Sequence, residues 1–249
     1  METYILKEKL NKEQLVIGGF LSLNHTSIIE MMGYSHFDFV VIDNEHGAFS
    51  EPDISELVKV SKYVGLTPIV RTVNKSDKIQ KVLDSGAHGI QIPMVNNKEE
   101  AEYAVQCALF PPLGNRGVSY SIPAAKYGLY NGREYLDHAN KQLTIAIQIE
   151  TEEAIRNIDE ILTVDYIDVV FIGKTDLSIN LGLDVSSKKF QSILDDLIQK
   201  VKNSNKKIGV VTSNELSTAE AIDQGIDYIV VVINSVISNA MKSVTNFKK

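Results

Sequence analysis

Two acidic side chains that follow neighbouring apolar segments could together hold a divalent metal. Glu150 follows LTIAIQI (143–149), where Gln148 and Glu150 alternate with isoleucines and share one face of an expected strand. Asp176 lies just beyond the next apolar segment. Two carboxylates completed by water and substrate are typical of Mg²⁺ or Mn²⁺, and zinc is disfavoured because no Cys/His cluster has suitable spacing. From the pattern alone, an ion pair with an arginine or lysine explains the carboxylates equally well.

Three further polar residues also stand at the ends of apolar segments. Arg71 ends TPIVR (67–71), where a guanidinium either binds a substrate carboxylate or enolate or forms a structural ion pair. Asp43 and His46 stand three residues apart after DFVVI (38–42). A carboxylate beside an imidazole orients it and raises its basicity, which suits a general base near neutral pH. The alternative for His46 is capping of the following helix.

Lys174 suggests a rival chemistry that needs no metal. A lysine at the end of the expected sixth strand can form a Schiff base with a ketone. Thr175 and Asp176 follow at once, in what reads as a sharp turn. An exposed lysine is commoner in such a place, and we favour that interpretation.

These residues need a fold that brings the ends of separate strands together. Eight runs rich in Val and Ile alternate with helical patterns, at 16–23, 38–42, 67–71, 89–92, 143–149, 167–172, 207–211 and 227–232. Such runs are typical of strands buried on both faces of a parallel sheet. They predict an α/β fold, a (β/α)₈ TIM barrel with its active site at the C-terminal ends of the strands. A doubly wound sheet is the alternative, but Gly18 and Gly19 lie inside the first run and leave no dinucleotide-binding loop.

Helical patterns separate the strands, and one connection is unusually long. We expect helices at 52–64, 76–85, 97–108, 151–161, 188–202 and 214–224. Residues 110–142 form an insertion after the fourth strand that is rich in Pro, Gly and Tyr and too long for an ordinary loop. We interpret this insertion as an active-site loop or an oligomer contact. No domain boundary is evident, so residues 1–249 are expected to form one barrel domain.

Composition argues against several classes of protein. With 25 basic and 32 acidic residues the net charge is −7, which argues against nucleic-acid binding and indicates no membrane-binding patch. No apolar run reaches the ~18 residues that span a bilayer. The single cysteine, Cys107, lies in an apolar helical pattern, which predicts a small core residue in a reducing compartment. The charged N-terminal segment lacks a signal-peptide pattern, and we expect a cytoplasmic protein.

Six segments, in order, resemble the HpcH/HpaI family of metal-dependent (class II) 2-oxo-acid aldolases, which are barrels of the phosphoenolpyruvate/pyruvate type. They are FDFVVIDNEHGAFS (37–50), TPIVR (67–71), GAHGIQIPMV (86–95), FPPLGNRGVS (110–119), IAIQIET (145–151) and FIGKTDLSINLG (171–182). The combination of DxEH, IQIET and IGxxDLS is specific, whereas any one of them alone is not.

The resemblance implies a role for each polar residue at the barrel mouth. Glu150 and Asp176 would ligate Mg²⁺, Mn²⁺ or Co²⁺, which would chelate the carboxylate and 2-oxo oxygens of pyruvate or a longer 2-oxo acid. Arg71 would stabilise the enolate. His46, oriented by Asp43, would transfer protons.

The resemblance also implies further substrate contacts and an assembly. Gln148 would line the pocket, and backbone N–H groups near Gly173 and Thr175 would hold the substrate carboxylate. Arg116, in the insertion, would close the site. The protein would be a homo-oligomer, either a dimer or a hexamer built from dimers, in which the dimers exchange a C-terminal helix at about 233–247.

The chain departs from the family at two places in the expected mouth. The family usually has Pro-Ala at Lys174-Thr175, and it usually continues the strand of Arg71 with a proline and an aromatic residue, where this chain has TVNKSDK (72–78). We expect both differences to affect binding of the second substrate and not binding of the metal.

We therefore expect reversible cleavage of a 4-hydroxy-2-oxo acid to pyruvate, or a related 2-oxo acid, and an aldehyde. One alternative is a citrate synthase of siderophore biosynthesis, which would join oxaloacetate to acetyl-CoA in the same site. A second is a Schiff-base aldolase that uses Lys174. A third is an inactive binding protein, against which the complete set of polar residues argues.

Overall fold

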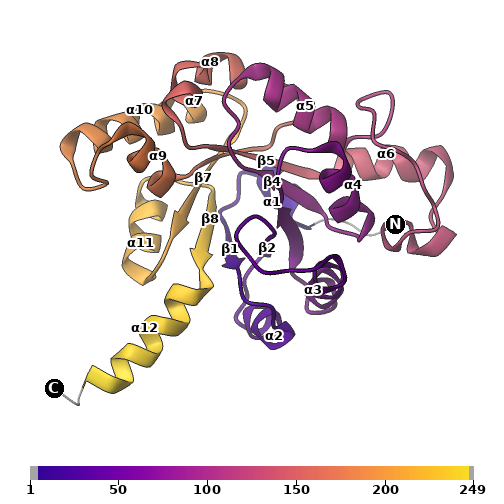
Figure 1. Ribbon diagram of the computed structural model, residues 1–249, viewed down its shortest axis with the longest axis horizontal. Coiled ribbons are helices and arrows are strands. Elements are labelled where there is room, and N and C mark those ends of the chain that lie inside the picture. The colour runs from indigo at the N-terminus through magenta and orange to yellow at the C-terminus, as the bar shows by residue number, and fades with distance from the viewer. Residues whose placement is uncertain (1–4, 247–249) are drawn as a thin grey trace.

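The structure is a computed structural model that describes residues 5–246, and its centre is a closed barrel of eight parallel strands (Figure 1). The strands follow chain order around the barrel, and β8 pairs with β1 to close it. They are β1 (Val16–Leu21), β2 (Phe39–Asp43), β3 (Thr67–Arg71), β4 (Gly89–Ile92), β5 (Thr144–Ile149), β6 (Val169–Ile172), β7 (Lys207–Thr212) and β8 (Tyr228–Val232). The predicted (β/α)₈ barrel is confirmed, and every strand overlaps the run that predicted it.

Alternate residues of the strands face the barrel interior and the surrounding helices. An apolar cluster that includes Phe39, Phe171 and Tyr228 fills the interior. The ring of Tyr228 stacks on Phe39, with 4.4 Å between the ring centroids, and meets Phe171 edge-on. A larger cluster joins the outer strand faces to the helices. Because Ala146 belongs to the interior cluster, the alternation along β5 also directs Glu150 inward.

Helices cover the outside of the barrel (Figure 1). They are α2 (Thr26–Tyr34), α3 (Glu51–Tyr63), α4 (Ser76–Asp84), α5 (Lys98–Ala108), α7 (Glu152–Arg156), α8 (Ile158–Ile161), α9 (Lys174–Leu181), α10 (Lys188–Lys202) and α11 (Glu215–Asp223). The single helix predicted at 151–161 is instead two short helices that meet at Asn157. The helical patterns did not predict α2 or α9, and α9 begins at Lys174, where the sequence suggested a turn.

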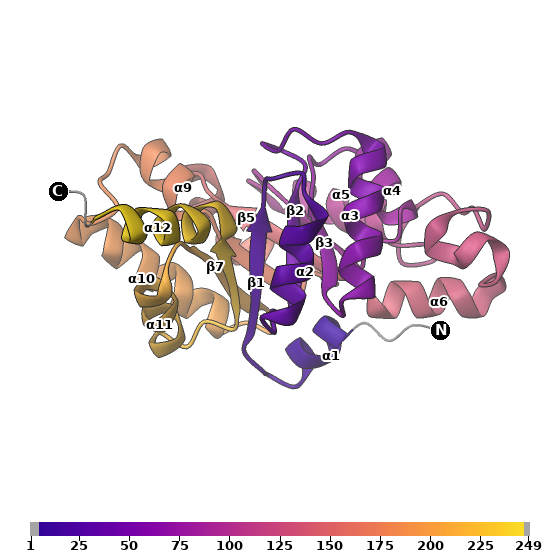
Figure 2. The ribbon, with the colours of Figure 1, turned by 90° about the horizontal axis from the view of Figure 1, so that it is seen from below.

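α1 (Ile5–Asn11) packs against the end of the barrel where the strands begin (Figure 2). Its Leu6 and Leu10 belong to the interior cluster and are at most 2% exposed. Lys7 forms an ion pair with Asp168, which precedes β6. The cavity described below lies at the opposite end of the barrel.

The insertion after β4 packs beside α4 rather than over the barrel mouth. It contains the 3₁₀ helix η1 (Pro123–Gly128), α6 (Gly132–Gln142) and its own apolar cluster around Phe110 and Tyr135. η1 contacts α4, and α6 lies at the outer edge of the molecule (Figure 1). None of its residues lines the cavity at the mouth, although Ile122 and Pro123 share a neighbouring pocket with Asn44 of the loop after β2. The roles of the insertion as an active-site loop and as an oligomer contact both stay predictions.

α12 (Ile233–Thr245) extends away from the barrel (Figures 1 and 2). Ile233 is its one buried residue, whereas Val236, Met241 and Val244 are each more than 40% exposed. The helix begins where it was predicted, and the predicted end at 247 lies outside the described residues.

Two further observations concern the helices. Within residues 5–246, none of them combines the length and apolarity that crossing a bilayer requires. Cys107 on α5 is a free cysteine and only 2% exposed, as predicted for a small core residue.

Candidate active site

A cavity of about 230 Å³ opens where the barrel strands end. It is lined by Phe20, Ser22, Asp43, His46, Arg71, Gln148, Phe171, Gly173, Lys174, Thr175, Asp176, Val211 and Val232. The structure therefore brings together nearly all of the predicted site residues. The exceptions are Glu150, which is hydrogen-bonded to Gln148, and Arg116, which lies elsewhere.

Arg71 is held at the end of β3 by two carboxylates. Its Nε donates to Oδ1 of Asp43 at 2.8 Å, and its Nη2 forms an ion pair with the same oxygen at 2.7 Å. Its Nη1 lies 3.2 Å from Oε2 of Glu45. The guanidinium also lies over the ring of Phe20, 4.6 Å from its centroid. Such a preorganised cation stabilises negative charge on a substrate without having to reorient.

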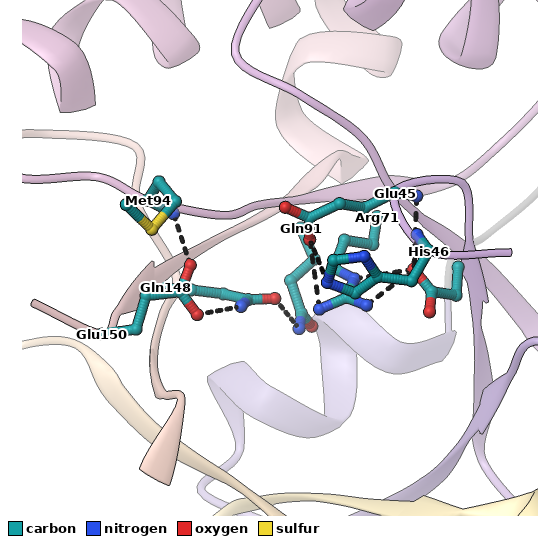
Figure 3. A network of polar contacts seen from close by, with 8 residues as sticks. Glu45, His46, Arg71, Gln91, Met94, Gln148 and Glu150 are labelled. Carbon is teal, nitrogen blue, oxygen red and sulfur yellow. Dashed lines mark hydrogen bonds and ion pairs between the residues drawn. The ribbon is translucent and has the colours of Figure 1, made fainter. Parts of the chain in front are cut away.

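The predicted pairing of Asp43 with the imidazole of His46 is wrong. Oδ1 of Asp43 accepts hydrogen bonds from the backbone N–H groups of Glu45 and His46, both at 3.2 Å, in addition to its hydrogen bond and ion pair with Arg71. The imidazole Nε2 lies 3.9 Å from Oε2 of Glu45 (Figure 3), and the His46 side chain is 71% exposed. Asp43 therefore orients Arg71 and the turn after β2. A backbone turn at Asp43 brings the N–H of His46, rather than its side chain, to the carboxylate.

A line of amide side chains leads to Glu150. Gln91 on β4 donates its Nε2 to Oε1 of Gln148 at 2.8 Å, and Gln148 donates its Nε2 to Oε2 of Glu150, also at 2.8 Å. The backbone N–H of Met94 donates to Oε1 of Glu150 at 2.7 Å (Figure 3). These bonds fix both oxygens of a carboxylate that is 4% exposed.

Glu150 has a buried carboxylate without a neighbouring cation. Burial raises the pKa of this carboxyl group, the hydrogen bonds from Met94 and Gln148 lower it, and the charges of Asp176 and Glu45 raise it. Within residues 5–246, no lysine or arginine forms an ion pair with Glu150. Glu150 therefore does not form the ion pair with an arginine or lysine that the sequence allowed. A bound metal cation would offset the cost of its buried charge.

Asp176 adds a second carboxylate from the third position of α9. Its side chain is exposed and lines the cavity. In the part of the chain that the structure describes, no group of three or more His, Cys, Asp and Glu residues is arranged to hold a metal. Glu150 and Asp176 would thus supply two oxygen ligands and leave the other positions to water and substrate. Hard oxygen donors beside an uncompensated buried charge fit Mg²⁺ or Mn²⁺.

Gly173 leaves the room that the Glu150 carboxylate occupies. A Cβ atom at position 173 would lie 2.6 Å from Oε2 of Glu150 and 3.0 Å from its Cβ. Gly173 is also the N-cap of α9, so the unpaired backbone N–H groups of the first helical turn adjoin the cavity at Thr175. Such groups favour an anion, as expected for the binding of a substrate carboxylate.

Lys174 is not the fully exposed lysine that the sequence suggested. Its side chain is half-buried and lines the cavity. Burial lowers the pKa of its ammonium group, and the charge of Glu220 on α11 raises it. The departure from the family at Lys174 and Thr175 therefore lies in the cavity wall.

Arg116 does not close the site of its own chain, contrary to expectation. Its Nη2 donates to Oδ1 of Asp84 at 2.7 Å, and its guanidinium lies over the ring of Phe110, 4.4 Å from the centroid. Arg116 is 7% exposed and joins the insertion to the end of α4. An ion pair between such distant segments has no signature in the sequence.

Three residues that support the site were not assigned to it from the sequence. Phe20 packs under the guanidinium of Arg71, and Gln91 starts the line of amides that ends at Glu150. Gln91 lies at the end of the fourth predicted strand, which places it at the barrel mouth, but the pattern assigned it no role there. Met94 offers no signal in the sequence, because it contributes a backbone N–H. Its φ of 55° is unusual for a residue other than glycine and indicates local strain at the site.

The fold and this cavity define a parallel α/β-barrel enzyme with an acidic site and a preorganised arginine. The model of one family, HpcH/HpaI aldolase/citrate lyase, matches residues 16–235. The chain belongs to this family, so the resemblance seen in its motifs and its class, that of carbon–carbon lyases, are confirmed.

Individual relatives agree with this assignment. The chain is 32% identical to the 4-hydroxy-2-oxo-heptane-1,7-dioate aldolase of Klebsiella pneumoniae, over 92% of this chain and 87% of that protein. It is 31% identical to the 2-keto-3-deoxy-L-rhamnonate aldolase of Salmonella typhi, over 93% and 87%. The solved structure of the citrate synthase SbnG has a TM-score of 0.85 at 27% identity, over 98% of this chain and 97% of that one.

Proposed function

We propose that this protein reversibly cleaves a 4-hydroxy-2-oxo acid to pyruvate, or a related 2-oxo acid, and an aldehyde. Two relatives are named as aldolases of 2-oxo acids, which supports this class of substrate. The observation that carries the proposal is the buried carboxylate of Glu150, which lacks a cation and lies near Asp176 in the site that also holds Arg71.

We infer that Glu150 and Asp176 hold a divalent metal, Mg²⁺ or Mn²⁺, with Co²⁺ as a further candidate. When bound, such an ion withdraws electrons from the 2-oxo group and so lowers the barrier to enolate formation. Gln148 keeps the Glu150 carboxylate in place through its hydrogen bond to Oε2.

The chain's own groups carry the remaining steps. Arg71 stabilises the charge that develops on the 2-oxo oxygen as the bond between C3 and C4 breaks. The N–H groups at the start of α9, near Thr175, bind the substrate carboxylate. His46, on the exposed side of the cavity, accepts the proton of the 4-hydroxyl group, and a proton is then returned to C3 to give pyruvate.

The direct test is pyruvate release from a panel of 4-hydroxy-2-oxo acids by protein treated with EDTA, before and after Mg²⁺ or Mn²⁺ is restored. We expect release to depend on the metal and to fall about 10²-fold or more in Arg71→Ala and Glu150→Ala. Turnover near the wild-type level in either variant would refute its assigned role.

A citrate synthase is a second candidate, favoured by the similarity to the structure of SbnG and by the altered cavity wall at Lys174. Such an enzyme would condense oxaloacetate with acetyl-CoA in the same site. Citrate formation from these two substrates, without pyruvate release from any hydroxy-oxo acid, would replace the aldolase proposal.

A Schiff-base aldolase is a third candidate, and the half-burial of Lys174 is the observation that favours it. Its expected signs are activity that survives EDTA and inactivation by borohydride in the presence of pyruvate. We favour the metal-dependent route because it accounts for the uncompensated charge of Glu150.

We further propose a homo-oligomer, a dimer or a hexamer built from dimers, in which α12 packs on a neighbouring copy. The projection of α12 from the barrel and its exposed Val236, Met241 and Val244 support this assembly. The cytoplasmic location expected from the sequence stays a prediction.

A further inference from the structure

Lys174 is a cation in the cavity wall that the proposed reaction does not use. It is the first residue of α9, and its side chain is half-buried. Within residues 5–246, it has no hydrogen-bond or ion-pair partner, although the more distant charge of Glu220 acts on it. A half-buried ammonium group without a partner in the protein is costly to hold, so an anionic group beside Lys174 would be favourable.

Arg71, the other strong cation in the cavity wall, has its charge already balanced. It is bound by Asp43 and lies 3.2 Å from Glu45. A second anionic group of a substrate is therefore attracted more strongly to Lys174 than to Arg71.

Lys174 lies between Glu150 and the strands β7 and β8 in the order of the barrel. Glu150 follows β5 and is held from the side of β4, whereas Lys174 follows β6 and is influenced by Glu220, on the helix after β7. The wall beyond Lys174, formed by β7 and β8, presents Val211 and Val232 to the cavity. Lys174 thus stands between the carboxylate of Asp176, on the same helix, and an apolar wall formed by β7 and β8.

We propose that Lys174 binds a carboxylate or phosphate at the far end of the aldehyde part of the substrate. This inference rests on the aldolase reaction proposed above. The apolar side chains of Val211 and Val232 suit the carbon atoms between that anion and the reacting carbonyl. Lys174 is then a specificity-determining residue, and the substrates are 4-hydroxy-2-oxo acids with a second acidic group.

The test compares aldehydes that differ only in charge, in the addition of pyruvate. One pair is succinic semialdehyde and its neutral methyl ester, and the other is glycolaldehyde phosphate and glycolaldehyde. For each pair, the ratio of kcat/KM for the anionic over the neutral aldehyde is measured in the wild type, Lys174→Met and Lys174→Arg. Lys188→Met, a change at an exposed lysine on α10, is the matched control, and thermal unfolding checks that each variant is folded.

We expect the ratio for at least one pair to fall roughly 10- to 100-fold in Lys174→Met, which is the worth of one hydrogen bond to a charged group. Lys174→Arg should recover most of it, and Lys188→Met should leave it unchanged. The pair that responds identifies the anion as a carboxylate or a phosphate. Unchanged ratios for both pairs in Lys174→Met would overturn the proposal.

Exchange of the methyl protons of pyruvate with D₂O separates this inference from the aldolase proposal. The exchange needs enolate formation but no aldehyde, so Lys174→Met should exchange at nearly the wild-type rate. A large loss of exchange in this variant would mean that Lys174 acts on the 2-oxo acid rather than on the aldehyde. If borohydride and pyruvate also trap Lys174 of the wild type in a covalent adduct, Lys174 is a covalent catalyst. Either result overturns the specificity role. Absence of exchange in the wild type would overturn the aldolase proposal and, with it, this inference.

Discussion

Asp43 and Arg71 face each other across β2 and β3, and one carboxylate oxygen, Oδ1, accepts a hydrogen bond from Nε of the guanidinium and forms an ion pair with its Nη2. The same oxygen accepts the backbone N–H groups of Glu45 and His46. Asp43 thereby fixes the direction of Arg71 relative to the turn after β2. We propose that the part of Asp43 in the reaction is to position Arg71.

Asp43→Asn should therefore act on turnover through Arg71. Loss of the charge loosens the guanidinium, and we expect kcat/KM for pyruvate release to fall about 10-fold or more. Because the two residues act together, Asp43→Asn should cost little further activity in an Arg71→Ala background. In a His46→Ala background, by contrast, Asp43→Asn should lower kcat/KM by its full factor. The opposite pattern is a loss that multiplies with that of Arg71→Ala and is absent in a His46→Ala background. That result would mean that Asp43 acts through the imidazole of His46.

Gly173→Ala should weaken metal binding, because the new Cβ would press on the Glu150 carboxylate. Displacement of a ligand from its position typically costs about 10- to 100-fold in metal affinity. Calorimetric titration with Mn²⁺ measures this. Gly117→Ala is the matched control, since the atoms nearest to its Cβ would be those of the Gln80 amide at 3.2 Å, away from the cavity. Equal Mn²⁺ affinity in Gly173→Ala and the wild type would count against Glu150 as a ligand.

Glu150→Gln should stabilise the metal-free protein while abolishing turnover. Burial raises the pKa of Glu150 above its ordinary value of 4.5, so the folded protein binds more protons than the unfolded chain just above that pH. The free energy of unfolding of the wild type therefore falls as pH rises through the folded-state pKa of Glu150. The variant has no carboxyl group at this position, so its free energy of unfolding does not fall for this reason. The side-chain amides of Gln148 and Gln91 can each turn by about 180°, so that Gln148 accepts a hydrogen bond from the new amide and donates one to Gln91. Gln91 is free to turn because its Oε1 has no hydrogen-bond partner among the described residues.

Thermal unfolding in EDTA at pH 4 and pH 7 measures this effect. We expect similar Tm values at pH 4, and at pH 7 a Tm about 2–4 °C higher in Glu150→Gln, the shift that 1 kcal/mol produces at this size. Added Mg²⁺ should raise the Tm of the wild type only. A lower Tm of the variant at pH 7 in EDTA would mean that the charge is already compensated without metal.

The sequence predicted the barrel well because its signal is strong and local. Strands buried on both faces need long Val/Ile runs, and all eight lie within two residues of those runs. The polar residues that follow these strands converge on one cavity because parallel strands end at the same rim. Glu150 could be placed inward by alternation with isoleucines alone.

The contacts within the site could not be predicted in the same way. Asp43 has several donors within reach, and the choice of Arg71 over the His46 imidazole depends on side-chain directions across two strands. Arg116 meets Asp84 through a fold of the insertion that periodicity does not describe. Lys174 seemed to lie in a turn because α9 starts directly after β6, without a side-chain cap to mark its beginning.

The assembly depends on the exposed side of α12, which should be sensitive to charge. The double variant Met241→Asp with Val244→Asp places two charges on its apolar face, and we expect dissociation to smaller species because charges are poorly tolerated in an interface core. Light scattering after gel filtration gives the mass. Asn239→Asp, on the opposite side of the helix, should keep the wild-type mass. An unchanged mass in the double variant would remove α12 from the interface.

The central claim is that Glu150 and Asp176 hold a metal that allows Arg71 to stabilise the enolate of a 2-oxo acid. Its most direct test is the rate at which the methyl protons of pyruvate exchange with D₂O, followed by proton NMR in metal-free and Mg²⁺-loaded protein. We predict exchange that appears with Mg²⁺, stops with EDTA and falls about 10²-fold in Glu150→Gln and in Arg71→Ala. Exchange that persists in EDTA and is lost in Lys174→Met would contradict the account.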